Sequence, residues 1–127
     1  MEVARFAARF FDDGGAGWLW AANDETEARF GYPIDHHNIG LPDAITEELD
    51  RLAEWHVTAL NWDYPPDPGP WREPECVAFN AAVATVLRQL RAALASDWEI
   101  IDESKPERED PDLDRYLADP GLFRRDR

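Results

Sequence analysis

The chain has 127 residues and a formal net charge of −14, with 27 acidic residues against 13 Lys and Arg. Its 44% hydrophobic content, with six Trp and six Phe, is enough to fill the core of one domain, which argues against a disordered chain. The charge has the wrong sign for direct binding to nucleic acid or an anionic membrane, and no apolar run approaches the roughly 20 residues of a membrane span. The N-terminus lacks the pattern of a signal peptide, so we expect a cytoplasmic protein.

The first third of the chain predicts a β-hairpin followed by a short helix. Apolar residues alternate along residues 3–11, as they do in a half-buried strand, and residues 18–22 are apolar enough for a second strand. Between them, residues 12–17 read DDGGAG, a turn signal because glycine reaches positive φ at little cost. These glycines lack the lysine and hydroxyl residue of a phosphate-binding loop, so we interpret them as a hairpin turn. Residues 24–30 then predict a short helix.

The middle of the chain predicts two long helices and a third strand. Apolar residues recur at helical spacing over residues 43–60 and again from about residue 70 to residue 95. Cys76 lies on the apolar stripe of the second of these helices, where we expect it to be buried. Residues 97–101 are short and rich in β-forming types, so we expect a strand there.

The segment that joins the two long helices, residues 61–71, reads NWDYPPDPGPW. Four of its eleven residues are proline, which fixes φ and keeps the preceding residue out of the helical region, so we expect a stiff, extended connection. We interpret Trp62 and Trp71 as plugs that pack against the helix ends. The residues left as candidates for contact with a partner are Asp63, Tyr64 and Asp67.

The order of these elements predicts an α+β fold. We expect a small antiparallel sheet, made of the N-terminal hairpin and a C-terminal strand, packed against the two long helices. Residues 1–102 would form this single domain. Residues 103–127 are of mixed charge, contain three prolines and have few apolar residues, so we expect a tail that is partly disordered or ordered by a partner.

No set of residues in the sequence predicts catalysis, and we expect no cofactor. Cys76 sits on an apolar stripe, and Ser96 and Ser104 lie outside any nucleophile motif. His36 and His37 are adjacent, and on an extended chain their side chains would point to opposite sides. We therefore expect no metal site, with a site built from His36 and His56 as the weaker alternative.

Three short motifs carry a resemblance to other proteins. FGYP at residues 30–33, Trp55-His56, and NWDYPP at residues 61–66 resemble a set of small, acidic, uncharacterised proteins of high-GC Gram-positive bacteria, over about residues 3–102. This resemblance implies one folded unit and no particular activity. In composition alone the chain is also similar to immunity proteins of bacterial toxin systems, which are small, acidic and without a catalytic motif.

Our leading hypothesis is a non-enzymatic, acidic protein-binding module of the immunity or antitoxin type. Residues 12–76 hold fifteen acidic residues against three arginines, a net charge of −12, which would attract and mask a basic surface on a partner protein such as a toxin. The expected partner-binding residues are Asp35, Glu47, Glu48, Asp63, Tyr64 and Asp67.

Two alternatives stay open at this point. One is a small ligand-binding or enzymatic domain with a pocket between sheet and helices, which His36, His56, Tyr64 and Trp55 would line. The other is an inhibitor that mimics DNA, which would require carboxylates arranged in two regular rows.

Overall fold

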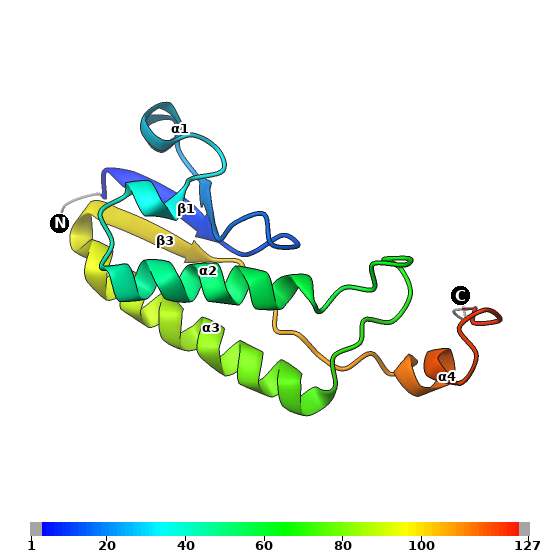
Figure 1. Ribbon diagram of the computed structural model, residues 1–127. Coiled ribbons are helices and arrows are strands. Elements are labelled where there is room, and N and C mark those ends of the chain that lie inside the picture. The colour runs from blue at the N-terminus through cyan, green and yellow to red at the C-terminus, as the bar shows by residue number, and fades with distance from the viewer. Residues whose placement is uncertain (1–3, 125–127) are drawn as a thin grey trace.

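A three-stranded sheet and two long helices form the body of the protein, and the chain then extends away from it into a short C-terminal helix (Figure 1). The computed structural model describes residues 4–124. None of the helices in that range is long and apolar enough to cross a bilayer. The elements are β1 Phe6–Phe10, β2 Leu19–Ala21, α1 Asp24–Phe30, the 3-10 helix η1 His36–Asn38, α2 Asp43–Val57, α3 Glu73–Leu94, the 3-10 helix η2 Ala95–Asp97, β3 Trp98–Asp102 and α4 Leu113–Ala118.

The sheet has the order β2-β1-β3, so the first strand of the chain is the central one. β1 pairs with β2 in antiparallel fashion, with Ala8 opposite Ala21, and with β3 in parallel fashion, with Phe6 opposite Trp98. The predicted α+β class is confirmed, but the expected antiparallel pairing of the last strand is wrong. The reason is the path of the chain: α3 carries it back to the end of the sheet where β1 begins, so β3 runs alongside β1 in the same direction.

The predicted elements all occur, with ends that shift by a few residues. The first strand was expected from Val3, which lies outside the described residues, and β1 begins at Phe6. α2 ends at Val57 instead of near residue 60, because the chain turns there toward the proline-rich segment. The short helix α1 is capped by Asn23, whose side chain accepts a hydrogen bond from the Thr26 backbone N–H.

The core lies between the sheet and the helices α2 and α3. Trp18 is its largest fully buried side chain, stacked on Phe10 at a centroid distance of 5.1 Å, and its indole N–H donates to the Leu49 carbonyl oxygen at 3.0 Å. Cys76 is buried with a free thiol, as its place on the apolar stripe predicted, and burial raises the pKa of that thiol.

We call residues 61–71 the proline loop. Its two tryptophans differ in burial. Trp71 is 5% exposed and its indole N–H donates to Thr58 Oγ1 at 2.9 Å, so it is the expected plug. Trp62 is 60% exposed, and the expectation that it packs into the core is wrong. Its indole N–H donates a hydrogen bond to the Val57 carbonyl oxygen at the end of α2. This bond satisfies the polar N–H and leaves most of the ring in solvent.

Residues 103–124 run from β3 past the start of α3 to the proline loop, then form α4 and a short segment after it (Figure 1). Asn80 of α3 holds this C-terminal segment through two hydrogen bonds: its amide donates to the Glu107 carbonyl oxygen, and its oxygen accepts from the Glu107 N–H. Leu113 and Phe123 are buried. The division of the chain into a domain of residues 1–102 and a tail stays a prediction.

Candidate functional site

Acidic side chains follow one face of α2. Asp43, Glu47, Asp50 and Glu54 are spaced by four, three and four residues, which places them in one stripe of a helix. Asp43, Glu47 and Glu54 are exposed, and among the described residues their carboxylates have neither a hydrogen bond nor an ion pair. We call these four residues the α2 stripe. Its three unpaired carboxylates are available to a cationic partner.

Glu48, which we predicted as a partner-binding residue, lies beside this stripe and is already paired. Arg51 donates from Nε and Nη2 to its two carboxylate oxygens at 2.6 and 2.8 Å, and this hydrogen bonding lowers the pKa of Glu48. Arg51 also lies over the ring of Trp55. Glu48 therefore offers less free charge than Glu47, one residue away.

Asp35 is exposed and serves first as a local cap. Its side chain accepts a hydrogen bond from the His37 N–H at 2.9 Å and so starts the 3-10 helix η1. One of its carboxylate oxygens remains for other contacts.

The proline loop has a fixed shape that we did not foresee from its residues. Asn61 is buried, and its side-chain oxygen accepts from the N–H groups of Asp63 and Tyr64 at 3.1 Å while its amide donates to the Pro68 carbonyl oxygen. At Gly69 an added Cβ would lie 2.0 Å from the Ala59 carbonyl oxygen, so only glycine permits this close approach. An Asn at the start of a turn is the sequence signal that could have predicted this role.

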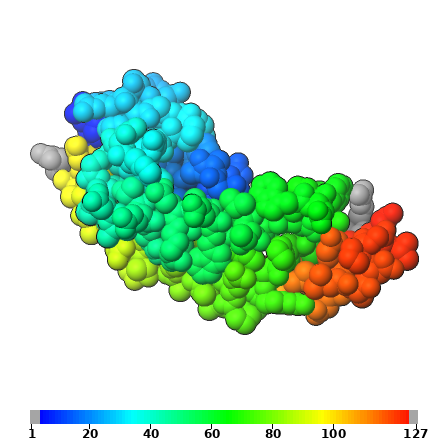
Figure 2. All heavy atoms as spheres, viewed as in Figure 1, coloured from blue at the N-terminus to red at the C-terminus, as the bar shows by residue number. Residues whose placement is uncertain are grey.

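Because the loop is held in this way, it presents three side chains outward. Trp62 and Tyr64 are 60% and 58% exposed, and Asp63 is also exposed, whereas Asp67 is half-buried. In Figure 2 the residues of α2 and of the proline loop lie next to one another on the visible face. These two neighbouring segments carry five of the six predicted partner-binding residues: Glu47, Glu48, Asp63, Tyr64 and Asp67.

A pocket of about 630 Å³ lies beside His56 in the last turn of α2, between the hairpin turn, α3 and residues 102–107. Its floor is apolar and includes Trp18 and Phe79. We proposed four side chains for a pocket, and only His56 lines this one. Trp55, His36 and Tyr64 lie elsewhere. The remaining lining residues with charged side chains are Asp12, Asp13, Arg88, Asp102, Glu103, Lys105 and Glu107.

His56 joins three segments of the chain at this pocket. Its Nδ1 lies 2.7 Å from Asp12 Oδ2 in the hairpin turn, and its Nε2 lies 2.8 Å from Glu107 Oε1 in the C-terminal segment. The ring stacks on Phe79 at a centroid distance of 4.8 Å. Burial by itself lowers the pKa of His56, but the hydrogen bonds to Asp12 and Glu107 outweigh it and raise the pKa to about 9.

These bonds define what His56 can do. At neutral pH it is an imidazolium that donates from both nitrogens, so neither nitrogen is free to bind a metal or to accept a proton. Asp12 is equally committed: its fully buried carboxylate also accepts from the N–H groups of Gly15 and Gly17. We therefore assign His56 a positioning role in the fold.

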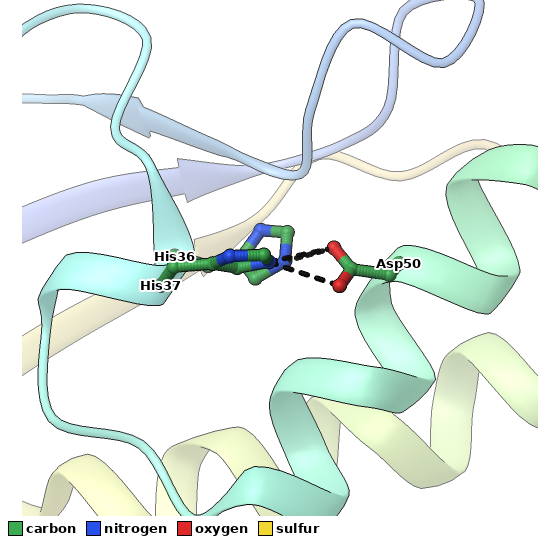
Figure 3. A group of neighbouring side chains, drawn as sticks. All are labelled: His36, His37 and Asp50. Carbon is green, nitrogen blue, oxygen red and sulfur yellow. Dashed lines mark hydrogen bonds and ion pairs between the residues drawn. The ribbon is translucent and has the colours of Figure 1, made fainter.

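A second histidine group has a different character. His36 Nε2 lies 2.7 Å from Asp50 Oδ1, and His37 Nε2 lies 2.9 Å from both oxygens of the same carboxylate (Figure 3). We expected the two rings to point to opposite sides of an extended chain, but η1 is a 3-10 helix and brings both to Asp50. His36 is buried and His37 exposed. The alternative pair of His36 and His56 is not formed, since each binds different carboxylates.

The comparison with known proteins rests on one finding. Residues 9–104, well over half of the chain, match the model of the family described as Serratia CdiI immunity protein-like. No curated protein and no solved structure matches the chain. The matched range contains the last two residues of β1, all of β2 and β3, both long helices, the α2 stripe and the proline loop. On this match, the chain belongs to the Serratia CdiI immunity protein-like family.

Proposed function

We propose that this protein is an immunity-type inhibitor, which binds a toxin and masks a basic surface on it without doing chemistry. Membership of an immunity protein-like family supports the inhibitor role and the toxin as partner. The observation that carries the masking step is the α2 stripe, because Asp43, Glu47 and Glu54 are exposed and unpaired among the described residues. Carboxylates in this state attract a cationic surface before contact and can bind Arg or Lys after it.

The proline loop supplies the other half of such a contact. Trp62 and Tyr64 are large rings on a backbone that Asn61 already fixes, so little conformational entropy is lost when a partner covers them. Aromatic anchors of this kind dominate the energy of many interfaces, while charges at the rim govern the association rate. We assign the stripe mainly to attraction and the loop mainly to retention.

Charge reversal on the stripe tests the proposal. Glu47→Lys combined with Glu54→Lys should slow association with the toxin that the parent protein binds by roughly tenfold or more at low salt, with a smaller difference at high salt. Glu99→Lys combined with Asp97→Lys is the matched control, since both residues are exposed, near β3 and away from α2. Biolayer interferometry at two NaCl concentrations measures both rates. Equal association rates for the two double variants would contradict masking through the stripe.

The loop has its own test in the same assay. Trp62→Ala and Tyr64→Ala should raise the dissociation rate, while Asp63→Lys with Asp67→Lys should lower the association rate. Unchanged rates for all of these variants would remove the proline loop from the interface and leave the stripe to be judged separately.

The pocket beside His56 supports a second candidate function, the binding of a small molecule. Its volume of about 630 Å³ falls within the usual range for ligand sites, and its floor is apolar. A thermal-shift screen tests it: a compound that raises the melting temperature of the protein, and loses this effect when Val83→Trp fills the pocket, would favour this function.

A further inference from the structure

The group of His36, His37 and Asp50 has the composition of a transition-metal site. Two imidazole nitrogens and one carboxylate oxygen are the donor types that zinc and its neighbours prefer, and three protein ligands leave one position open. The possible ligand atoms lie within 4.8 Å of one another. Figure 3 shows the two rings directed at the same carboxylate. The convergence comes from two separate elements, η1 and α2, and so does not follow from sequence proximity alone.

The spacing of the three side chains is close to what an ion requires. At metal–ligand distances of about 2.0–2.2 Å, a tetrahedral ion holds its ligand atoms roughly 3.3 Å apart. The two histidine nitrogens lie 2.7 and 2.9 Å from Asp50 Oδ1, so each nitrogen needs to move about half an ångström away from the carboxylate. His37 is exposed and can rotate outward, whereas the buried His36 keeps the site in place.

The surroundings favour a cation. A hollow of about 430 Å³ opens beside the group and is lined by Asp35, His36, Asp50 and Glu54. Two of these carboxylates, Asp35 and Glu54, are exposed, so they add negative potential and can accept hydrogen bonds from water bound to an ion. The group thus sits at the edge of the α2 stripe, in the most acidic part of the chain.

We propose that His36 Nε2, His37 Nε2 and one oxygen of Asp50 bind a divalent transition metal such as Zn²⁺, with the remaining position open to water. The ion takes the place of the hydrogen bonds between the two rings and the carboxylate, and each ring then carries its N–H on Nδ1. The ion ties η1 to α2 and lowers the negative charge of the stripe at Asp50, between Glu47 and Glu54. This proposal is independent of toxin binding and can hold or fail without it.

Isothermal titration of the full, untagged chain with ZnCl₂ at pH 7.5 tests the site. The expected result is saturable binding of one ion per chain and a rise in the melting temperature. His37→Gln and Asp50→Asn should each weaken binding by at least about tenfold, because each removes one ligand. Glu47→Gln is the matched control: it removes one carboxylate of the stripe and no ligand, and it should change the dissociation constant by less than about twofold.

Several results would overturn the proposal. These are the absence of saturable Zn²⁺ binding, equal affinities of the parent and His37→Gln, or competition by MgCl₂ at equal concentration, which would indicate general attraction of cations to acidic groups. Should Asp50→Asn fail to fold, His37→Gln decides the question alone, since His37 is exposed and its circular dichroism spectrum can be compared with that of the parent.

Discussion

His56 shows how one residue can hold distant parts of a chain together. It is on α2, but its two hydrogen bonds reach the hairpin turn at Asp12, 44 residues earlier, and the C-terminal segment at Glu107, 51 residues later. Asp12 in turn orders the glycine turn. A charged ring between two carboxylates on an aromatic surface is stable only when fully paired, because the isolated charges would lose their hydration without compensation.

The raised pKa of His56 predicts a dependence of stability on pH. Its pKa is about 9 in the fold and about 6.5 when unfolded, so its contribution is complete below pH 6.5 and is lost as the pH rises through 9. We expect the free energy of unfolding to fall by about 1–3 kcal/mol over this window. Urea denaturation at several pH values measures it.

The Cys76 thiol also weakens the fold at high pH, since its pKa is raised by burial. His56→Gln is therefore the control: it keeps Cys76 and loses the titrating ring, so the difference between the two pH profiles isolates His56. Parallel profiles for parent and variant would contradict the assignment.

At the scale of an element, the proline loop combines a buried anchor with an exposed face. Trp71 packs against Trp55 and Phe79, at centroid distances of 5.7 and 4.9 Å, while Trp62 stands in solvent. Asn61 and Gly69 fix the path between them. The loop is thus part of the core at one end and part of the surface at the other.

This division predicts opposite outcomes for the two tryptophans. Trp71→Ala should lower the free energy of unfolding by about 3–5 kcal/mol, because it leaves a cavity and removes the hydrogen bond that the indole donates to Thr58 Oγ1. Trp62→Ala should cost about 1 kcal/mol or less, because its ring is mostly solvated. Urea denaturation of both variants checks the contrast, and equal losses would contradict it.

The sequence predicted the two long helices and the hairpin, because each depends on a local pattern of apolar residues or glycine. It did not predict the direction of β3, since the residues of Trp98–Asp102 carry no mark of which strand they pair with. That direction depends on where α3 returns the chain. Local patterns in the sequence therefore predicted the helices and strands, whereas the direction in which β3 pairs depends on the tertiary path of the chain.

The candidate site divides in a similar way. The acidic residues Asp35, Glu47 and Asp63 can be read directly from the sequence. Which carboxylates form ion pairs or hydrogen bonds with other side chains cannot. Glu48 is neutralised by Arg51, three residues after it, whereas Glu47 stays unpaired among the described residues. The convergence of His36 and His37 on Asp50 required the 3-10 helix η1, and its three polar residues do not predict a helix.

The whole molecule carries a charge of −14, and such an excess repels itself in the compact state. Its surface ion pairs offset little of this repulsion, because an exposed pair such as Arg5 with Glu25 or Arg51 with Glu48 contributes little to stability. The fold therefore depends on its apolar core to overcome its own charge.

Added NaCl should stabilise the protein for this reason. Raising NaCl from about 0.01 M to about 1 M shortens the Debye length from roughly 30 to 3 Å, and we expect the melting temperature at pH 7.5 to rise by a few degrees. Near pH 4.4, where the net charge is close to zero, the same change should have little effect. Differential scanning fluorimetry measures both. A melting temperature that falls with NaCl at pH 7.5 would show that specific ion pairs outweigh the repulsion.

The central position of β1 has a consequence for synthesis on the ribosome. β1 leaves the exit tunnel first, yet its parallel partner follows only at Trp98, 92 residues after Phe6. Until then the strand has only the three residues of β2 beside it, and a two-stranded hairpin is marginal by itself. The nascent chain must therefore carry both long helices and an unpaired edge of β1 until β3 has been synthesised, and any product released before residue 98 lacks the strand that completes the sheet.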